Sequence, residues 1–146
     1  MKILQNLVFA MALLIAVLPA FAQAQDAEIA PTVVINLTSD DVWTGQMALG
    51  IARKIQNAGA KVVVFLNVRA VTLAIQNVPQ HVEAMSGKTA HQMLAEIMSE
   101  GGRVFVCPGC HEQAGLDIAD RIDGIEPGGP ELLDIVTAPG TRIMSY

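Results

Sequence analysis

Both cysteines of this chain lie in one pentapeptide, Cys107-Pro108-Gly109-Cys110-His111. A Cys-x-x-Cys-His sequence is compatible with four chemistries: covalent attachment of haem, dithiol redox exchange, part of a metal site, or sulfur transfer through a thiol. Each of these chemistries needs a different environment around the cysteines. The rest of the sequence therefore has to discriminate among them.

The beginning of the chain has the pattern of a secretory leader. Lys2 supplies a short positive start, residues 7–17 are almost continuously apolar, and small residues suited to cleavage end at Ala22 and Ala24. This pattern predicts a signal peptide over residues 1–22, cleaved after Ala22 or Ala24. The apolar run is shorter than the roughly 20 residues of a membrane span, so we expect no stable membrane insertion after cleavage.

The remaining sequence has the length of one domain. We expect a flexible lead-in over residues 23–31 and a single domain over residues 32–146, located in the periplasm or secreted. The net charge of −5 argues against nucleic acid as a partner. An exported protein can keep a structural disulfide, but Cys107 and Cys110 would close a loop too small to stabilise the fold much. The pair therefore points to chemistry.

Strand-like and helix-like segments alternate along the domain. Strands are expected at residues 32–37, 61–67, 103–107 and 141–146, and helices at 42–59, 69–77, 88–102, from 109 onward and at 130–136. Residues 117–130 look like a loop. The alternation predicts an α/β fold: a single three-layer domain with a mainly parallel sheet flanked by helices. Trp43 and the helical methionines are expected in the core or in a subunit interface.

Polar side chains follow the first two predicted strands, and a cysteine ends the third. Ser39 and Asp40 come after the first strand, Asn67 and Arg69 after the second, and Cys107 closes the third. In parallel sheets, reactive groups gather at the carboxyl ends of the strands. We therefore expect these five residues to converge. Helix capping is the simplest role for Asp40 and its neighbour.

The haem interpretation rests on the pentapeptide alone. A c-type attachment site needs an accessible segment and a broad apolar pocket, whereas Cys107 ends a strand of the buried type and aromatic residues are scarce. A c-type electron carrier with covalent haem remains an alternative. Our main expectation is that the protein has no cofactor.

Thioredoxin-like and metal-site interpretations also have weak support. In thioredoxin folds the cysteine pair follows an early strand, whereas only 36 residues follow Cys110 here. Disulfide exchange on another fold stays possible. A zinc site needs four ligands at paired spacings, and this chain has one cysteine pair and three scattered histidines. We expect no metal.

The domain resembles the DsrE/DsrF-like family of small sulfur-relay proteins. The resemblance is carried by 32-TVVINLTSDD-41, 61-KVVVFLNVRAVTLA-74, 103-RVFVCPGCHEQAGL-116 and a short closing strand that ends in Tyr146. In the family's third region a cysteine ends a strand and a glycine follows eight residues later. Cys107 and Gly115 have this separation here.

The resemblance implies a persulfide carrier or sulfur-transfer protein that forms trimers or hexamers. Cys107 would accept sulfane sulfur from a protein or small-molecule donor and pass it to an acceptor. Cys110 is additional to the family pattern and could resolve a persulfide into a disulfide. The residue before the glycine is Ala114, where the family pattern has a basic residue or methionine. Arg69 could replace a basic group there if the strand ends converge.

Two points stay open at the level of sequence. His111 could hold a thiolate as an ion pair, or it could be an ordinary exposed residue of a helix. The protein could also be a non-catalytic oligomeric binding module whose cysteines rest as a disulfide.

Overall fold

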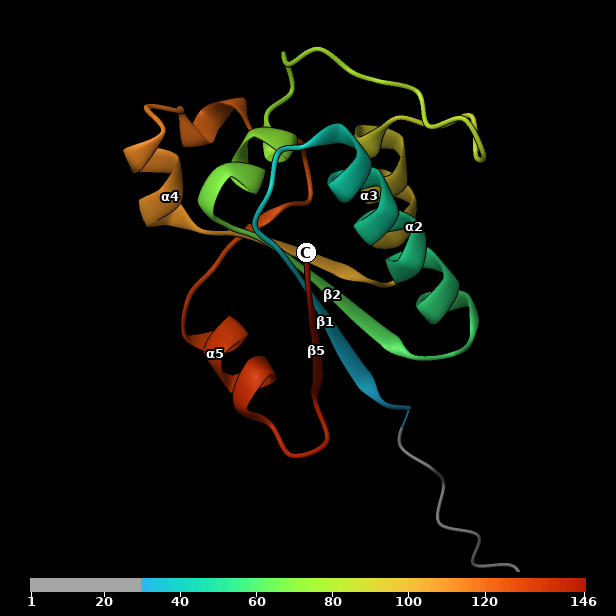
Figure 1. Ribbon diagram of the computed structural model, residues 1–146. Helices are drawn as coiled ribbons and strands as arrows, with labels where there is room; N and C mark the ends of the chain where they lie inside the picture. Colours follow the sequence, from blue (N-terminus) through green and yellow to red (C-terminus); the bar gives the residue numbers. More distant parts are fainter. Residues whose placement is uncertain (1–29) are drawn as a thin grey trace, which may run out of the picture.

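A computed structural model describes residues 30–146 (Figure 1). The expected leader and most of the lead-in lie outside these residues. The strands are β1 (Thr32–Leu37), β2 (Lys61–Leu66), β3 (Arg103–Val106), β4 (Glu126–Pro127) and β5 (Arg142–Ser145). The helices are α2 (Val42–Asn57), α3 (Ala90–Ser99), α4 (Pro108–Gln113), α5 (Pro130–Thr137) and the 3-10 helices η1 (Val68–Ala74) and η2 (Ile118–Asp120).

The five strands form one sheet in the order β4-β3-β2-β1-β5, and every neighbouring pair is parallel. β2 occupies the centre, which explains its continuous apolar sequence: a central parallel strand is covered on both faces. The α/β prediction is confirmed. Residues 117–130, which look like a loop in the sequence, contain two short elements: the 3-10 helix η2, and β4, which pairs with β3.

Helices cover both faces of the sheet. On one face the larger core includes Ile35, Val64 and Leu94, beneath α2, α3 and η1. On the other face a smaller core joins Phe105 to Leu132 of α5. Figure 1 shows α5 on the opposite side of the sheet from α2 and α3. The result is the expected three-layer arrangement.

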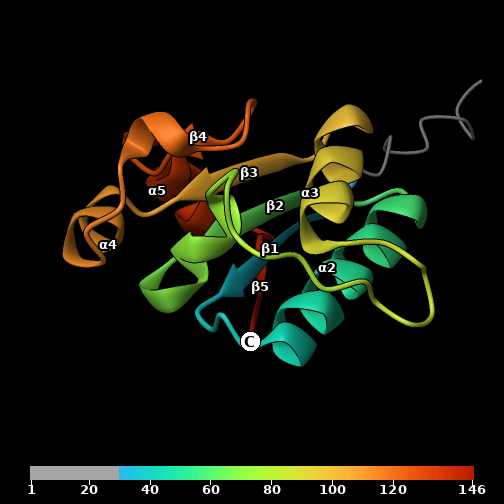
Figure 2. The same ribbon diagram turned by 90° about the horizontal axis from the view of Figure 1, so that it is seen from above.

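Helices α2, α3 and α4 each begin at a capping side chain, and a glycine with positive φ follows each of them. Asp41 accepts the amide of Thr44 at the start of α2, and Thr89 forms a capping box with Gln92 at the start of α3. The helix expected over residues 69–77 is instead the 3-10 helix η1. Figure 2 shows η1 and α4 side by side, at the carboxyl ends of β2 and β3.

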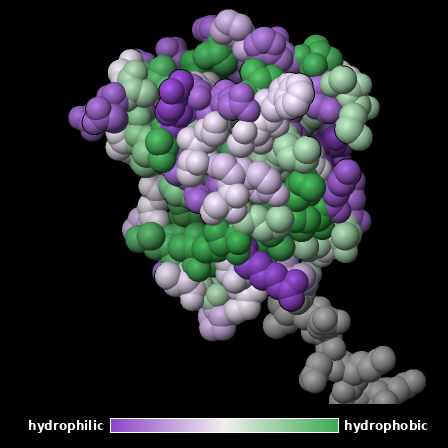
Figure 3. Space-filling view, in the orientation of Figure 1, coloured by the Kyte–Doolittle hydropathy of each residue, from purple (hydrophilic) through white to green (hydrophobic). Residues whose placement is uncertain are grey.

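Several large apolar side chains lie on the surface. Trp43 and Met47 of α2 are largely exposed, so they do not belong to the core of this chain. Leu133 of α5 and Ile143 of β5 are exposed as well, and Figure 3 shows apolar surface gathered on that side of the molecule. Within residues 30–146, no helix is long and apolar enough to cross a membrane.

Candidate functional site

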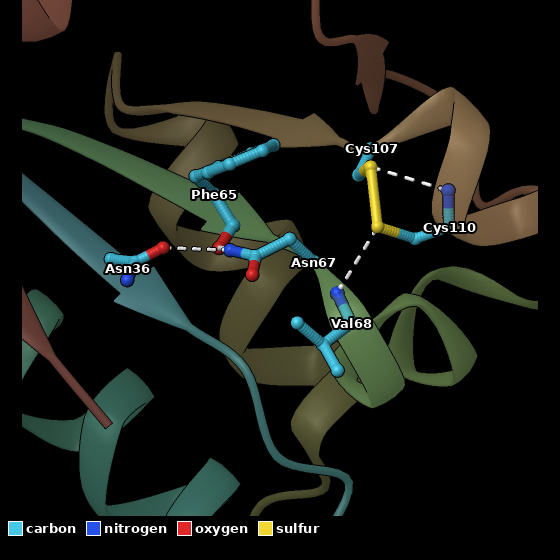
Figure 4. The surroundings of a disulfide bond; sticks show 6 residues. All are labelled: Asn36, Phe65, Asn67, Val68, Cys107 and Cys110. Atoms are coloured by element: carbon cyan, nitrogen blue, oxygen red, sulfur yellow. Dashed lines mark hydrogen bonds between the residues drawn. A yellow bond between two sulfur atoms is a disulfide. The ribbon is translucent and has the colours of Figure 1, made fainter.

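Cys107 and Cys110 form a disulfide at the junction of β3 and α4 (Figure 4). The amide of Cys107 donates to the Leu66 carbonyl over 2.9 Å, so the strand pairing with β2 continues up to the first cysteine. Pro108 then starts α4, as its fixed φ favours in the first turn of a helix. The disulfide therefore lies at the carboxyl edge of the sheet.

Each sulfur of the disulfide accepts one backbone N–H. The amide of Cys110 donates to Cys107 Sγ over 3.2 Å, and the amide of Val68 donates to Cys110 Sγ over 3.3 Å. Val68 has φ = 51°, and within residues 30–146 no other residue besides glycine has a positive φ. A β-branched residue is uncommon in that region of φ/ψ space, so the turn after β2 is held in an unfavourable conformation that directs its N–H at the sulfur.

Asn67 is the buried residue that precedes this turn. Its side-chain amide donates to Asn36 Oδ1 over 2.7 Å and to the Phe65 carbonyl over 3.3 Å. Asn36 in turn donates to Ser145 Oγ of β5 over 3.1 Å. These bonds tie the end of β2 to β1 and β5, so Asn67 positions Val68 without touching either sulfur through a hydrogen bond.

An open groove of about 700 Å³ lies beside the disulfide. Its lining includes both cysteines together with Asp40, Val68, Arg69 and Gln113. Of the five residues expected to converge, Asp40, Arg69 and Cys107 therefore line this groove, whereas Asn67 does not. Ser39 is outside this lining, and its hydroxyl accepts the amide of Asp41 in the turn before α2.

Asp40 and Arg69 form an ion pair in the groove. Nε and one terminal nitrogen of Arg69 donate to Asp40 Oδ2 over 3.1 and 2.9 Å. The Arg69 side chain is 75% exposed, so water screens the pair. The guanidinium lies where a basic group was expected, but its charge is offset by Asp40.

His111 is buried, with 2% of its surface exposed, so the expectation of an exposed helical side chain is wrong. Burial lowers the pKa of His111. The Cys107 carbonyl acts to raise this pKa, and the charge of Arg121 lowers it further. Burial thus disfavours the protonated ring that an ion pair with a thiolate would need. Within the described residues, neither ring nitrogen makes a hydrogen bond. The expected supporting role of His111 as a cation next to the sulfurs therefore has no geometric basis.

The end of α4 explains the spacing between Cys107 and the later glycine. Gly115 has φ = 67°, and its amide donates to the Glu112 carbonyl while the amide of Leu116 donates to the His111 carbonyl. These two bonds form a Schellman motif, which requires a left-handed residue and so favours glycine. The glycine ends the short helix that Cys107 begins.

Metal ligands do not cluster in the part of the chain that the structure describes. No group of three or more His, Cys, Asp or Glu side chains there is placed to hold an ion. Sequence reasoning missed the role of the Val68 amide, because a backbone N–H with positive φ on a valine leaves no compositional signal.

Comparison with known proteins connects this geometry to a family. The model of the DsrE/DsrF-like family matches residues 32–145. The YchN protein from E. coli has a similar crystal structure, with a TM-score of 0.62 and 21% identity, covering 81% of this chain and 100% of YchN. The protein of unknown function MTH1491 from Methanobacterium thermoautotrophicum matches with a TM-score of 0.65 and 14% identity, covering 80% of this chain and 99% of that protein. Comparison with curated proteins gives no significant match. The five-stranded parallel sheet, the cysteine at the end of β3 and the family match agree, and this chain belongs to the DsrE/DsrF-like family.

Proposed function

We propose that this protein is an exported member of the family that handles sulfur through a nucleophilic cysteine. Cys107 accepts sulfane sulfur as a persulfide, and Cys110 is its redox partner. One observation carries the proposal: the two sulfurs are bonded to each other beside an open groove, and each accepts a backbone N–H.

The two N–H groups favour the form of cysteine that reacts. A thiolate, and not a thiol, attacks a sulfur donor. A hydrogen bond to the charged form lowers the pKa of a group, so the amides of Cys110 and Val68 favour the thiolates once the disulfide is reduced. The groove gives a donor room to reach them.

A purely structural disulfide is a weaker account of the pair. The two cysteines are three residues apart. Cross-linking so short a loop removes little entropy from the unfolded chain, and residues 30–146 already contain substantial cores on both faces of the sheet. Outside the cytoplasm a disulfide is also the resting state expected for an exchangeable pair.

We also propose that the chain forms a homo-oligomer, a trimer or a hexamer. β5 pairs with β1 on one side, and no other described strand pairs with its second edge. Ile143 on this strand and Leu133 on α5 are exposed apolar residues, and such surface commonly marks an interface. Analytical ultracentrifugation of the purified protein tests this proposal, and a monomer at working concentrations would refute it.

The sulfur proposal is tested on two matched variants that each keep one cysteine. Cys110→Ser and Cys107→Ser are reduced, freed of reductant and treated with a low-molecular-weight alkyl persulfide. Intact mass should show one added sulfur atom on Cys110→Ser, removed again by reductant. Cys107→Ser should gain much less, because the proposal assigns loading to Cys107. Absence of a reductant-sensitive sulfur on Cys110→Ser would refute the proposal.

The wild-type protein, with both cysteines, tests the haem alternative. Expression in a host that matures c-type cytochromes would add a haem mass that survives reductant if Cys107, Cys110 and His111 formed an attachment site. The sulfur proposal expects no such addition.

A further inference from the structure

We propose that the wild-type protein does not keep its persulfide but reduces it: Cys110 discharges the sulfur held on Cys107 as hydrosulfide. The inference rests on the proposed function, since Cys107 must first be loaded. It adds a product, hydrogen sulfide, and a co-substrate, an external dithiol.

The position of the two sulfurs favours this discharge. They form a bond in the native fold, with Cys107 and Cys110 separated by 5.2 Å between their Cα atoms. The attack of Cys110 on Cys107 therefore needs no movement of the backbone away from the conformation described. Groups held in reacting geometry behave as if present at very high effective concentration. An acceptor that must diffuse into the groove competes poorly with such a neighbour.

Hydrogen bonds to the disulfide favour the product of the discharge. The amide of Cys110 donates to Cys107 Sγ, and the amide of Val68 donates to Cys110 Sγ. Both donors are in place when the Sγ–Sγ bond exists, so the native structure matches the state after discharge. The turn at Val68, which has a positive φ and follows the buried Asn67, directs its N–H at the sulfur of Cys110 and not at that of Cys107. This placement suits Cys110 as the attacking thiolate.

The discharge is a nucleophilic displacement at sulfur. The Cys110 thiolate attacks the inner sulfur of the Cys107 persulfide. The Sγ–Sγ bond forms, the bond between Cys107 Sγ and the outer sulfur breaks, and the outer sulfur leaves as hydrosulfide with its proton. The sulfane sulfur takes up two electrons, and the two cysteine sulfurs lose them. An external dithiol then reduces the disulfide and is itself oxidised to a disulfide.

The groove makes that second step feasible. It is open to solvent, is lined by both cysteines, and carries one cation and one anion that offset each other, Arg69 and Asp40. A thiolate can therefore approach the disulfide without meeting a net charge in the groove. Each cysteine can leave as a thiolate that accepts an N–H, from the amide of Cys110 or of Val68.

The test compares reduced wild type with Cys110→Ser, under anaerobic conditions and with one equivalent of alkyl persulfide. Wild type should release one hydrosulfide per chain and end as a disulfide, two hydrogens lighter than the dithiol. Cys110→Ser should keep the added sulfur and release essentially none. A later dithiol treatment should return wild type to the reactive state for a second, equal release.

The outcomes separate the two proposals. If Cys110→Ser loads and wild type also keeps its added sulfur with Cys110 free, the discharge inference is wrong and the carrier function stands. If Cys110→Ser does not load, the proposed function fails and the discharge inference fails with it. Cys110→Ala, checked for native circular dichroism, guards against a local folding defect in the serine variant. A Cys107→Ser, Cys110→Ser protein gives the background release from the donor.

Discussion

Two helices of this domain begin in the same way but carry different atoms at the cap. Asp41 precedes α2 with φ = −61° and ψ = 130°, and Cys107 precedes α4 with φ = −72° and ψ = 112°. Each side chain accepts the amide three residues later, over 2.9 Å at Asp41 and 3.2 Å at Cys107. The two caps have similar backbone dihedral angles, but the capping atom is a carboxylate oxygen at Asp41 and a sulfur at Cys107.

The two caps differ in their distance from the sheet. Three residues separate the end of β1 at Leu37 from Asp41, whereas Cys107 directly follows the last residue of β3. The cap of α4 is therefore at the carboxyl edge of the sheet, where the turn after β2 brings the Val68 amide to Cys110. A strand-to-helix turn whose cap is a cysteine at the sheet edge places a sulfur where the proposed sulfur chemistry needs it.

Replacing the sulfur cap by a carboxylate should give the largest effect. Cys107→Asp keeps an N-cap acceptor, so α4 should remain folded, while sulfur loading should vanish. Intact mass after persulfide treatment measures loading, and circular dichroism checks the fold. Cys107→Ser is the matched neutral cap and should also fail to load. Residual loading of Cys107→Asp equal to that of Cys110→Ser would show that Cys107 is not the acceptor.

Removing the partner of Arg69 should give the next largest effect. Asp40→Asn leaves the guanidinium without its counter-charge, so we expect loading by thiosulfate, a dianion, to quicken about fivefold at low ionic strength. The gain should shrink as salt is added. The rate of sulfite release measures it. Asp134→Asn, the same change of charge on α5 across the sheet, is the control, and an equal gain there would contradict a local role for Asp40.

The ends of the two helices allow a smaller, structural test. Gly115 ends α4 with a positive φ, so Gly115→Ala should destabilise the protein by about 1 kcal/mol. Gly50 lies inside α2 with open space around its Cα, so Gly50→Ala should stabilise it by a similar amount. Denaturant unfolding measures both free energies. A destabilisation at Gly50 equal to that at Gly115 would contradict the assignment of the left-handed stop.

The smallest expected effect is the dependence of stability on pH that the carboxylate cap at Asp41 introduces. Hydrogen bonds from Thr44 lower the pKa of Asp41 below its ordinary value of 3.8. The stabilisation from this cap is therefore complete above that value and is lost as pH falls through the lower pKa of the folded state. Asp41→Asn caps without titrating, so its melting temperature should fall less steeply below about pH 4. Asp134→Asn serves as the control. Melting temperatures that fall in parallel with pH for wild type, Asp41→Asn and Asp134→Asn would contradict this prediction.

Much of this arrangement could be predicted from sequence. The β-branched runs of β1, β2 and β3, together with Pro108 after Cys107, were enough to expect a parallel sheet with a cysteine at its edge. β4 was missed because two residues, one of them proline, carry no periodic pattern. The burial of His111 was missed because α4 is too short for helical periodicity to assign its faces. The φ of Val68 depends on the tertiary contacts of Asn67, which no local pattern encodes.

The most direct test of the central claim is the intact mass of the protein from the periplasm of a host that matures c-type cytochromes. Samples prepared without reductant are measured before and after reduction. The account predicts a chain that gains two hydrogens on reduction, at Cys107 and Cys110. A haem mass that survives reductant, or a mass that reduction leaves unchanged, would contradict it.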